Sequence, residues 1–495
     1  MRNQVQLIAY ADRLGGTLRG LDELLHGPLG GLFGGVHLLP FFDPYDGADA
    51  GFDPADHRQV DPRLGTWADI ARLSGSFEVA ADLIVNHMST DAAPFLDFRE
   101  QGDASRWAGM FLTFDRVFAD GATEDQILRI YRPRPGLPFT PLVSKGAGRR
   151  LLWTTFTSRQ VDLDVHDPET ERYLVDILGL LADNGVAIVR LDAVGYAVKT
   201  AGTSCFMTEA TLDYVEELRG RANKLGIEVL AELHSHYDQQ IRMSKVVDRV
   251  YDFALPPLVL HALFTGDGQP LRRWLDLRPK NAITVLDTHD GIGLIDVSTD
   301  QTVGELTPLL SSKQVRELAM QVHENSEGTS VLATGQTTDE LDIYQIDCSF
   351  YDALGRDPGR YLLARLLQFF VPGVPQVYYV GLLAGRNDPR LRARTGDGRE
   401  LNRRRYTGDE LTAALEQPVV QDLLRLIRFR NEHPAFQGAF SCLDAPDGGL
   451  VLRWRNGSHE TRLSPDLAAG TYTLSYTDPA GGMERLVTAA ADLRG

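Results

Sequence analysis

Gly185-Val-Ala-Ile-Val-Arg-Leu-Asp192 is an apolar run that ends in a carboxylate. Ile227-Glu-Val-Leu-Ala-Glu232 and Ala282-Ile-Thr-Val-Leu-Asp-Thr-His-Asp290 repeat the pattern. A near-continuous apolar strand indicates burial on both faces, as in a parallel sheet covered by helices. In a closed barrel of such strands, active sites lie at the carboxyl ends. Three acids at those ends therefore predict an enzyme.

Eight short apolar segments predict parallel strands, and amphipathic stretches such as 169–182 and 212–224 predict helices between them. The expected strands are 6–11, 35–42, 79–87, 185–193, 227–234, 249–255, 282–290 and 374–380. This count is typical of an α/β protein with a (β/α)8 TIM barrel. A doubly wound sheet is disfavoured because no GxGxxG turn is present.

The spacing of these segments predicts four parts. Residues 1–87, 167–291 and 356–432 form the barrel, and 88–166 and 292–355 are loop-rich subdomains inserted after the third and seventh strands. Long insertions at this end of a barrel usually shape substrate access. Residues 433–495 alternate in polarity between turns rich in Gly, Pro and Asp, which predicts a small antiparallel β domain.

Composition excludes several classes of function. The 495 residues carry a formal net charge of −18, which argues against nucleic-acid backbones and anionic membranes as partners. The three cysteines have no CxxC spacing, so neither a disulfide framework nor a zinc site is expected. The start of the chain has no signal-peptide pattern, and no apolar stretch is long enough to span a membrane. We therefore expect a cytoplasmic protein.

Paired carboxylates in one cavity suit the cleavage of a glycosidic bond. One can attack the anomeric carbon while the other protonates the leaving oxygen, and retention of configuration requires a separation of roughly 5–5.5 Å. Arg190 and Asp192 lie two apart on a strand and so point the same way, and we expect the guanidinium to keep the nucleophile ionised.

Four ordered motifs resemble those of the α-amylase superfamily of glycoside hydrolases. They are Val85-Asn-His87, Val189-Arg-Leu-Asp-Ala193, Val229-Leu-Ala-Glu232 and Leu286-Asp-Thr-His-Asp290. The chain resembles the sucrose phosphorylase branch more narrowly, through residues 39–53, 130–139, 201–207, 341–345 and 375–380. The likeness runs from the first strand to about Glu432. Thr288 stands where many superfamily members have Asn, as in that branch.

The resemblance implies a retaining transfer of glucosyl from sucrose to inorganic phosphate, which yields α-glucose 1-phosphate and fructose. Asp192 would be the nucleophile, Glu232 the general acid/base and Asp290 the stabiliser of the transition state. The residues that it implies around the glucosyl ring are Asp49, Phe52, His87, Phe156, Gln160, Arg190, Tyr196, His289 and Arg399. Members of the branch need no metal, so we expect no metal and no cofactor. The resemblance also allows a homodimer.

Phosphate as the acceptor requires a cationic group beside the glucosyl-enzyme. The resemblance implies Arg134 as the anion clamp, Tyr344 as a hydroxyl donor and His234 nearby. A loop carrying Asp342 and Gln345 would swing out as the arginine swings in, so that fructose and phosphate use one acceptor site in turn.

Several alternatives stay open at this point. Phosphorylases acting on sucrose 6′-phosphate, glucosylglycerol or glucosylglycerate share this chemistry, as does a sucrose hydrolase or transglucosidase. A different class is a metal-dependent barrel hydrolase in which His234 and His236 chelate an ion together with His87, His289 and Asp290.

Overall fold

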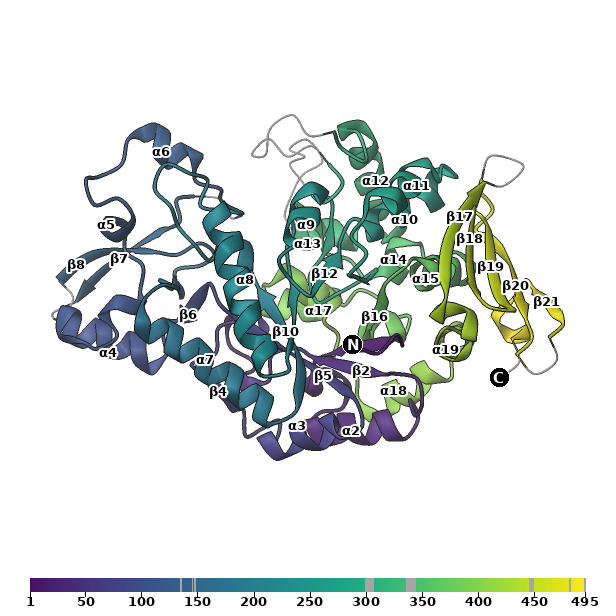
Figure 1. Ribbon diagram of the computed structural model, residues 1–495, viewed down its shortest axis with the longest axis horizontal. Coiled ribbons are helices and arrows are strands. Elements are labelled where there is room, and N and C mark those ends of the chain that lie inside the picture. The colour runs from purple at the N-terminus through teal and green to yellow at the C-terminus, as the bar shows by residue number, and fades with distance from the viewer. Residues whose placement is uncertain are drawn as a thin grey trace.

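A closed barrel of eight parallel strands forms the centre of the computed structural model, which describes residues 1–133, 136–144, 146, 148–298, 307–334, 344–444, 449–479 and 482–493 (Figure 1). In chain order the strands are β1 (Gln6–Ala9), β2 (Gly35–Leu38), β5 (Glu78–Ile84), β10 (Val186–Asp192), β11 (Glu228–Ala231), β12 (Arg249–Asp252), β13 (Ala282–Thr284) and β16 (Val374–Tyr378). β1 pairs with both β2 and β16, which closes the ring. Each lies within or beside a segment predicted as a strand, so the predicted barrel is confirmed.

Helices cover the outside of the barrel. They include α2 (Leu18–His26), α3 (Trp67–Ser74), α7 (Pro168–Asp183), α8 (Glu209–Lys224), α9 (Tyr237–Met243), α10 (Leu255–Thr265), α11 (Gln269–Leu277), α15 (Pro358–Phe370) and α19 (Pro418–Glu432). α7 illustrates why such segments are helical: Leu174, Ile177, Leu178 and Leu181 recur at helical spacing and are buried. The side chain of Asp167 caps its first turn by accepting from the backbone N–H of Glu169.

The segment between β5 and α7 has its own small cores. It contains β6 (His87–Ser89), α4 (Ala93–Gln101), α5 (Phe114–Val117), α6 (Glu124–Arg129), the hairpin of β7 (Phe139–Ser144) and β8 (Gly148–Trp153), and β9 (Gln160–Asp162). Phe95, Phe98 and Phe111 form one cluster, and Phe118 and Trp153 belong to another. β6 pairs with β9, and this pairing returns the chain to the mouth of the barrel.

The segment after β13 packs on the barrel instead. It contains β14 (Ile292–Gly293), α12 (Ser312–Asn325), α13 (Thr329–Thr334), β15 (Gln345–Ile346) and α14 (Phe350–Ala353). Leu318 and Val322 of α12 belong to the main hydrophobic core. β14 and β15 pair antiparallel, so residues just after the fourth motif lie beside residues just before α14.

Shorter elements complete the chain, and a five-stranded sheet closes it. They are α1 (Ala11–Leu14), β3 (Phe42–Asp43), β4 (Asp56–Val60), α16 (Tyr379–Leu382), α17 (Pro389–Thr395), α18 (Gly408–Leu415) and the antiparallel strands β17 (Ala439–Asp444), β18 (Leu450–Asn456), β19 (His459–Asp466), β20 (Thr471–Thr477) and β21 (Glu484–Val487). This terminal sheet confirms the predicted antiparallel β domain. It lies at the opposite end of the molecule from β7 and β8 (Figure 1).

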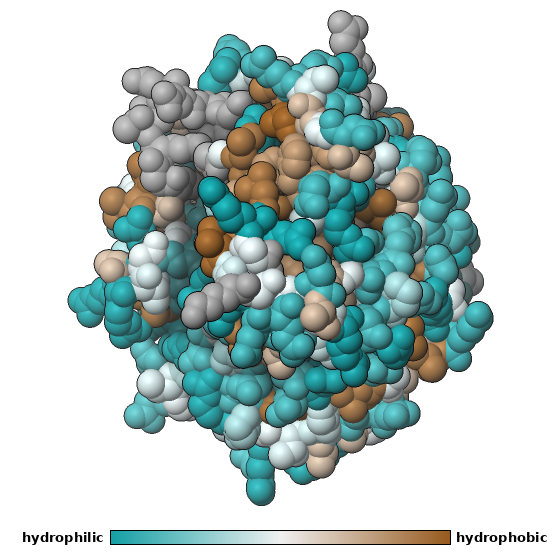
Figure 2. All heavy atoms as spheres, turned by 90° about the vertical axis from the view of Figure 1, so that its left-hand side faces the viewer, coloured by the Kyte–Doolittle hydropathy of each residue, from teal (hydrophilic) through white to brown (hydrophobic). Residues whose placement is uncertain are grey.

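The face at the β7–β8 end is mostly hydrophilic, with apolar side chains gathered in its upper half (Figure 2). Leu128, Leu137 and Val143 of this segment are exposed. Such exposed apolar side chains are compatible with a second copy of the chain, and the homodimer stays a prediction. Among the described residues, no helix is both long and apolar enough to cross a membrane.

A buried ion pair ties α15 to the segment after β13. Nη2 of Arg365 lies 2.7 Å from Oδ2 of Asp287, and both side chains are buried. Arg365→Met leaves a buried, unpaired carboxylate and should lower the free energy of unfolding by about 3–5 kcal/mol. Urea denaturation measures this, with Arg19→Met of the exposed Arg19–Glu23 pair as the control, which should cost below about 1 kcal/mol. Equal losses would contradict this account of the pair.

Candidate active site

Arg190 gathers two of the three predicted acids at the carboxyl ends of β10 and β11. Its Nη1 lies 3.1 Å from Oδ1 of Asp192, and its Nη2 lies 4.0 Å from Oε2 of Glu232. Asp192 is the last residue of β10, and Glu232 follows β11 directly. The two carboxylates therefore share one guanidinium and one side of the barrel mouth.

Glu232 is also fixed by the backbone. The N–H of Ala193 donates to its Oε2 at 3.0 Å. Ala193 has a left-handed conformation, with φ of 50° and ψ of 27°. A non-glycine residue adopts this conformation at a cost, and such strain concentrates at functional sites. The residue in this conformation is thus the one whose N–H binds the second carboxylate.

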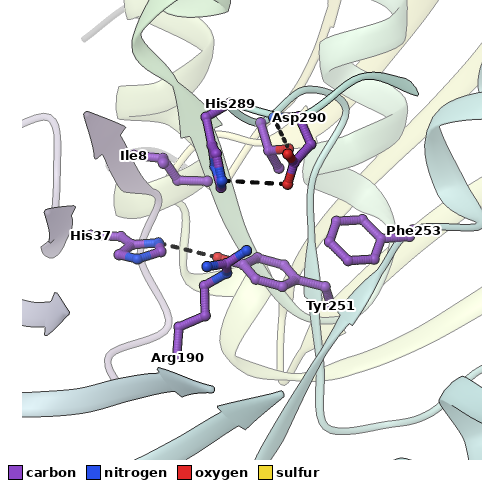
Figure 3. Close-up of a pocket in the computed structure, with 8 residues that line it drawn as sticks. Ile8, His37, Arg190, Tyr251, Phe253, His289 and Asp290 are labelled. Atoms are coloured by element: carbon purple, nitrogen blue, oxygen red, sulfur yellow. Dashed lines mark hydrogen bonds and ion pairs between the residues drawn. The ribbon is translucent and has the colours of Figure 1, made fainter. Parts of the chain in front are cut away.

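A chain of buried polar side chains inside the barrel supports Arg190, and Figure 3 shows two of its members, His37 and Tyr251, in contact. Asp82 on β5 accepts from Arg190 and lies 3.2 Å from Nε2 of His37, and Nδ1 of His37 lies 3.2 Å from the hydroxyl of Tyr251. Tyr251 in turn donates to Gln376 at 3.0 Å. Satisfied networks of this kind fix their members in place. Asp82 consequently shares the charge of Arg190 with Asp192.

The charges around Asp192 modify the expectation that Arg190 alone keeps it ionised. Burial raises the pKa of Asp192 well above the ordinary carboxyl value, and the charge of Glu232 adds to this while Arg190 opposes it. Burial is the main reason for the difference, and the charge of Asp82, which also pairs with Arg190, acts in the same direction. Two interacting carboxyls retain one proton into a pH range where isolated carboxyls are both ionised. Such a pair can supply one acid and one nucleophile.

Asp290 is held as an anion at the same mouth. Burial opposes ionisation, but neighbouring positive charge outweighs it and keeps the pKa of Asp290 well below its usual range. Burial lowers the pKa of His289 to about 3, so this imidazole is neutral at pH 7. Nη1 of Arg399 lies 3.1 Å from Oδ1 of Asp290 and 2.9 Å from Oδ1 of Asp49, and His234 and Arg190 contribute further positive charge.

Aromatic and polar side chains line the other side. Nε2 of His87 lies 3.0 Å from the carbonyl oxygen of Phe52 and 3.1 Å from the amide nitrogen of Gln160. The buried ring of Phe52 stacks on His289, with centroids 4.8 Å apart. Phe156 meets His87 and Tyr196 edge to face, with centroids 5.7 and 5.3 Å apart.

The residues predicted for the acceptor side are only partly described. Arg134 and Asp342 lie outside the described residues. His234 is buried, with Nε2 3.7 Å from Oε1 of Glu232. The hydroxyl of Tyr344 donates to the carbonyl oxygen of His234 at 3.0 Å. Gln345 is half-buried and pairs with Gly293 between β15 and β14.

Three imidazoles present polar atoms toward this region. Nδ1 of His87, Nδ1 of His289 and Nε2 of His234 are buried and have no hydrogen-bond partner among the described residues. Buried polar atoms are normally satisfied, so these atoms suit a ligand rich in hydroxyl groups. A small pocket adjoins Asp290, and its lining residues are Ile8, His37, Arg190, Tyr251, Phe253, Thr288, His289 and Asp290 (Figure 3).

The metal-hydrolase alternative requires His234 and His236 to chelate one ion. Instead, Nδ1 of His236 accepts from the backbone N–H of Asp238 and caps α9, whereas His234 faces Glu232. One atom each of Glu232, His234 and Asp290 lie within 4.8 Å of one another. This places Asp290 beside Glu232, as a shared sugar-sized site requires, and leaves His236 out of it.

Several residues of the site were missed by sequence reasoning. Asp82 had a readable signal, since it is an acid inside the buried apolar part of strand β5. Lys199 had none: it reaches across to Asp162 at 2.6 Å and Asn86 at 2.8 Å, and so secures β9. Asp296, which contacts His234 at 3.2 Å, follows a short strand that no periodicity marks.

Known proteins match this chain over nearly its whole length. The alpha-amylase catalytic domain profile matches residues 14–239. The sucrose phosphorylase of Agrobacterium vitis is 52% identical over 96% of this chain and 97% of that protein. The sucrose phosphorylase of Bifidobacterium adolescentis is 49% identical over 94% of this chain and 92% of that protein. The chain belongs to the sucrose phosphorylase branch of the α-amylase family.

Membership in this branch makes the chain an enzyme of the glycosyltransferase class and accounts for its fold. The crystal structure of sucrose 6F-phosphate phosphorylase from Thermoanaerobacter thermosaccharolyticum superposes with a TM-score of 0.90 at 36% identity, covering 99% of this chain and 98% of that chain. The glucosylglycerol phosphorylase of Marinobacter adhaerens is 38% identical over 98% of this chain and 99% of that protein. Members of the branch therefore share the barrel and differ in acceptor.

Proposed function

We propose that this chain is a sucrose phosphorylase that transfers glucosyl from sucrose to inorganic phosphate with retention of configuration. The observation that carries the proposal is the pair of carboxylates, Asp192 and Glu232, that share the guanidinium of Arg190 at the barrel mouth. Retaining glycosyl transfer needs two such groups on one ring. The identity of about 50% with two sucrose phosphorylases supports sucrose as the donor.

In the first displacement, a carboxylate oxygen of Asp192 attacks the anomeric carbon and forms a glucosyl ester. Glu232 gives its proton to the leaving oxygen, so fructose departs neutral. Asp290, held as an anion by Arg399, stabilises positive charge on the ring in the transition state. In the second displacement, phosphate attacks the same carbon and its proton passes to Glu232. The products are α-glucose 1-phosphate and the free carboxylate of Asp192.

The remaining predicted residues fit the glucosyl ring. Carboxylate and guanidinium groups match vicinal hydroxyls, and the pair of Asp49 and Arg399 offers both at one position. Nδ1 of His87 and Nδ1 of His289, which have no hydrogen-bond partner within the described part of the chain, offer further contacts. We assign to this ring the substrate-binding residues Asp49, Phe52, His87, Phe156, Gln160, Arg190, Tyr196, His289 and Arg399.

Fructose and phosphate would then use the space beside Glu232 in turn. We assign to this acceptor side Arg134, His234, Asp342, Tyr344 and Gln345. His234 supports the assignment because it lies next to Glu232, and Tyr344 supports it because its hydroxyl donates to the backbone of His234. The 38% identity with a glucosylglycerol phosphorylase makes glycerol an acceptor worth testing.

The test supplies sucrose with and without phosphate and measures glucose 1-phosphate against free glucose. We expect glucose 1-phosphate to dominate when phosphate is present, with the α configuration at its anomeric carbon. In the reverse direction, fructose should accept glucosyl from glucose 1-phosphate better than fructose 6-phosphate, glycerol or glycerate. Free glucose at the same rate in both tubes would make the chain a hydrolase, and a preference for another acceptor would move it to a related phosphorylase.

A further inference from the structure

Asp296 is a buried carboxylate that the proposed reaction does not use. It lies three residues after β14 and has no exposed surface. Its Oδ2 lies 3.2 Å from Nδ1 of His234, and its Oδ1 accepts from the backbone N–H of Ser235 at 3.2 Å and from the amide of Gln240 at 2.7 Å. Both oxygens of this carboxylate thus have hydrogen-bond partners, and Oδ2 is the one that contacts the imidazole.

His234 links this carboxylate to Glu232. Its second nitrogen, Nε2, lies 3.7 Å from Oε1 of Glu232. One face of the ring stacks on Phe253, with centroids 3.9 Å apart, and the ring of Tyr344 lies against it at 6.2 Å. Asp290 is the third acid that acts on the imidazole. The ring is therefore held between a buried anion and the proposed acid/base.

Gly293 leaves the space in which Asp296 meets His234. A Cβ at this position would lie 2.1 Å from Oδ2 of Asp296 and 3.1 Å from Nδ1 of His234. The first distance is far inside van der Waals contact, so any side chain at residue 293 would displace the carboxylate. The contact between Asp296 and His234 therefore depends on a glycine in the neighbouring strand.

The charge on His234 follows from these contacts. Burial disfavours the imidazolium, but the charge and hydrogen bond of Asp296, together with Glu232 and Asp290, raise the pKa of His234 above its ordinary value. An imidazole whose Nδ1–H donates to a carboxylate is also fixed in orientation. Nε2–H of the cation then points to the side on which Glu232 lies.

We propose that Asp296 is a positioning residue that keeps His234 cationic beside Glu232 and thereby favours phosphate over water as the acceptor of the glucosyl group. This inference rests on the proposed function. Once fructose has left with its proton, Glu232 is a carboxylate, and an incoming dianion must approach that charge. A cation 3.7 Å from Glu232 offsets the repulsion. Water carries no charge, so the cation does little to stabilise its approach.

Bonds, protons and charge all balance in the second displacement. The hydroxyl oxygen of hydrogen phosphate bonds to the anomeric carbon while the ester bond to Asp192 breaks. The proton of that hydroxyl passes to Glu232, and the total charge is unchanged. His234 retains its own proton throughout and supplies only charge and a donor.

The first variant is Asp296→Asn, which removes the anion but keeps the size of the side chain. Its amide would donate to Nδ1 of His234 and so favour the neutral imidazole. The glucosyl-enzyme is formed from α-glucosyl fluoride, and the ratio of glucose 1-phosphate to free glucose is measured. We expect this ratio to fall roughly tenfold or more, because unit charges a few ångströms apart interact by several kcal/mol near a protein surface. Asp352→Asn, which removes a buried carboxylate that pairs with Arg356, should leave the ratio unchanged.

Two further variants separate this role from a merely structural one. Gly293→Ala should lower the same ratio by displacing Asp296, whereas Gly220→Ala, where a Cβ meets no atom, should not. In a His234→Gln background, Asp296→Asn should have little further effect on the ratio, because Asp296 acts through the imidazole. Additive losses in the double variant would overturn the proposal.

A measurement on the unmodified enzyme decides the matter if the variants do not fold. Azide is a monoanion across the neutral and mildly alkaline range, so its own charge does not change. The ratio of glucosyl azide to glucose should fall as the pH rises past the ordinary range of histidine, because His234 then loses its charge. A flat ratio, or an unchanged ratio in folded Asp296→Asn, overturns this inference while glucose 1-phosphate formation stands. If the unmodified enzyme makes no glucose 1-phosphate, the proposed function itself fails.

Discussion

Asp192→Asn should fold normally and lose at least about 10³-fold in kcat with sucrose and phosphate. The amide cannot form the glucosyl ester, and no other described carboxylate shares its position on β10 beside Arg190. Asn has the size of Asp, so the packing is retained. Because Asn carries no charge, its contact with Arg190 is weaker. Steady-state kinetics measure the loss, and the thermal midpoint reports the fold.

The activated donor α-glucosyl fluoride sharpens this prediction. Fluoride leaves without help from an acid, so a variant that lacks only the acid recovers on this donor. Asp192→Asn lacks the nucleophile and should stay inactive with it. Turnover within tenfold of the unmodified enzyme on either donor would assign the nucleophile to another residue.

Glu232→Gln should lose about 10²–10⁴-fold with sucrose but retain the formation of glucosyl-enzyme from α-glucosyl fluoride. The residue supplies a proton that fructose needs and fluoride does not. Glu228→Gln is the matched control, since Glu228 opens the same strand β11 at the opposite end of the barrel. It pairs with Arg249, and its replacement should leave both donors unaffected.

The same variant carries a pH prediction. Asp192 must be ionised to attack, so the first displacement slows as the pH falls through the pKa of Asp192, which burial and the charge of Glu232 raise. Glu232→Gln removes that charge and lowers this pKa. The acid limb of the rate with α-glucosyl fluoride should therefore move to lower pH, and a limb that stays in place would mean that the two carboxyls do not interact.

The barrel could be predicted from the sequence because its strands are buried on both faces and read as apolar runs. Two details of the fold could not. The segment 88–166 was expected to be rich in loops, yet it contains a helix of nine residues, a hairpin and two apolar clusters, because its aromatic side chains pack on one another. The segment after β13 buries Leu318 and Val322 in the main core, a contact that depends on tertiary packing rather than local pattern.

The site divides in the same way. The sequence identifies three acids because each ends an apolar strand or follows one closely: Asp192, Glu232 and Asp290. Their supporting residues come from distant segments, so the sequence does not show which acid or imidazole each of them contacts. Asp82 lies 108 positions from Arg190, and Asp296 lies 62 positions from His234. The sequence thus predicted which three acids share the barrel mouth, whereas the charge state of Asp192 depends on contacts that only folding creates.

The glucosyl ester on Asp192 can be trapped and located by mass spectrometry. The Glu232→Gln variant is incubated with α-glucosyl fluoride without phosphate, denatured rapidly and digested with a protease. The masses of the peptides are then measured. We predict that the peptide containing Asp192 gains the mass of one glucosyl residue, that fragmentation places this mass on Asp192, and that added phosphate or azide discharges it. A glucosyl group on any other residue, or release of β-configured product with no ester at all, would contradict the account.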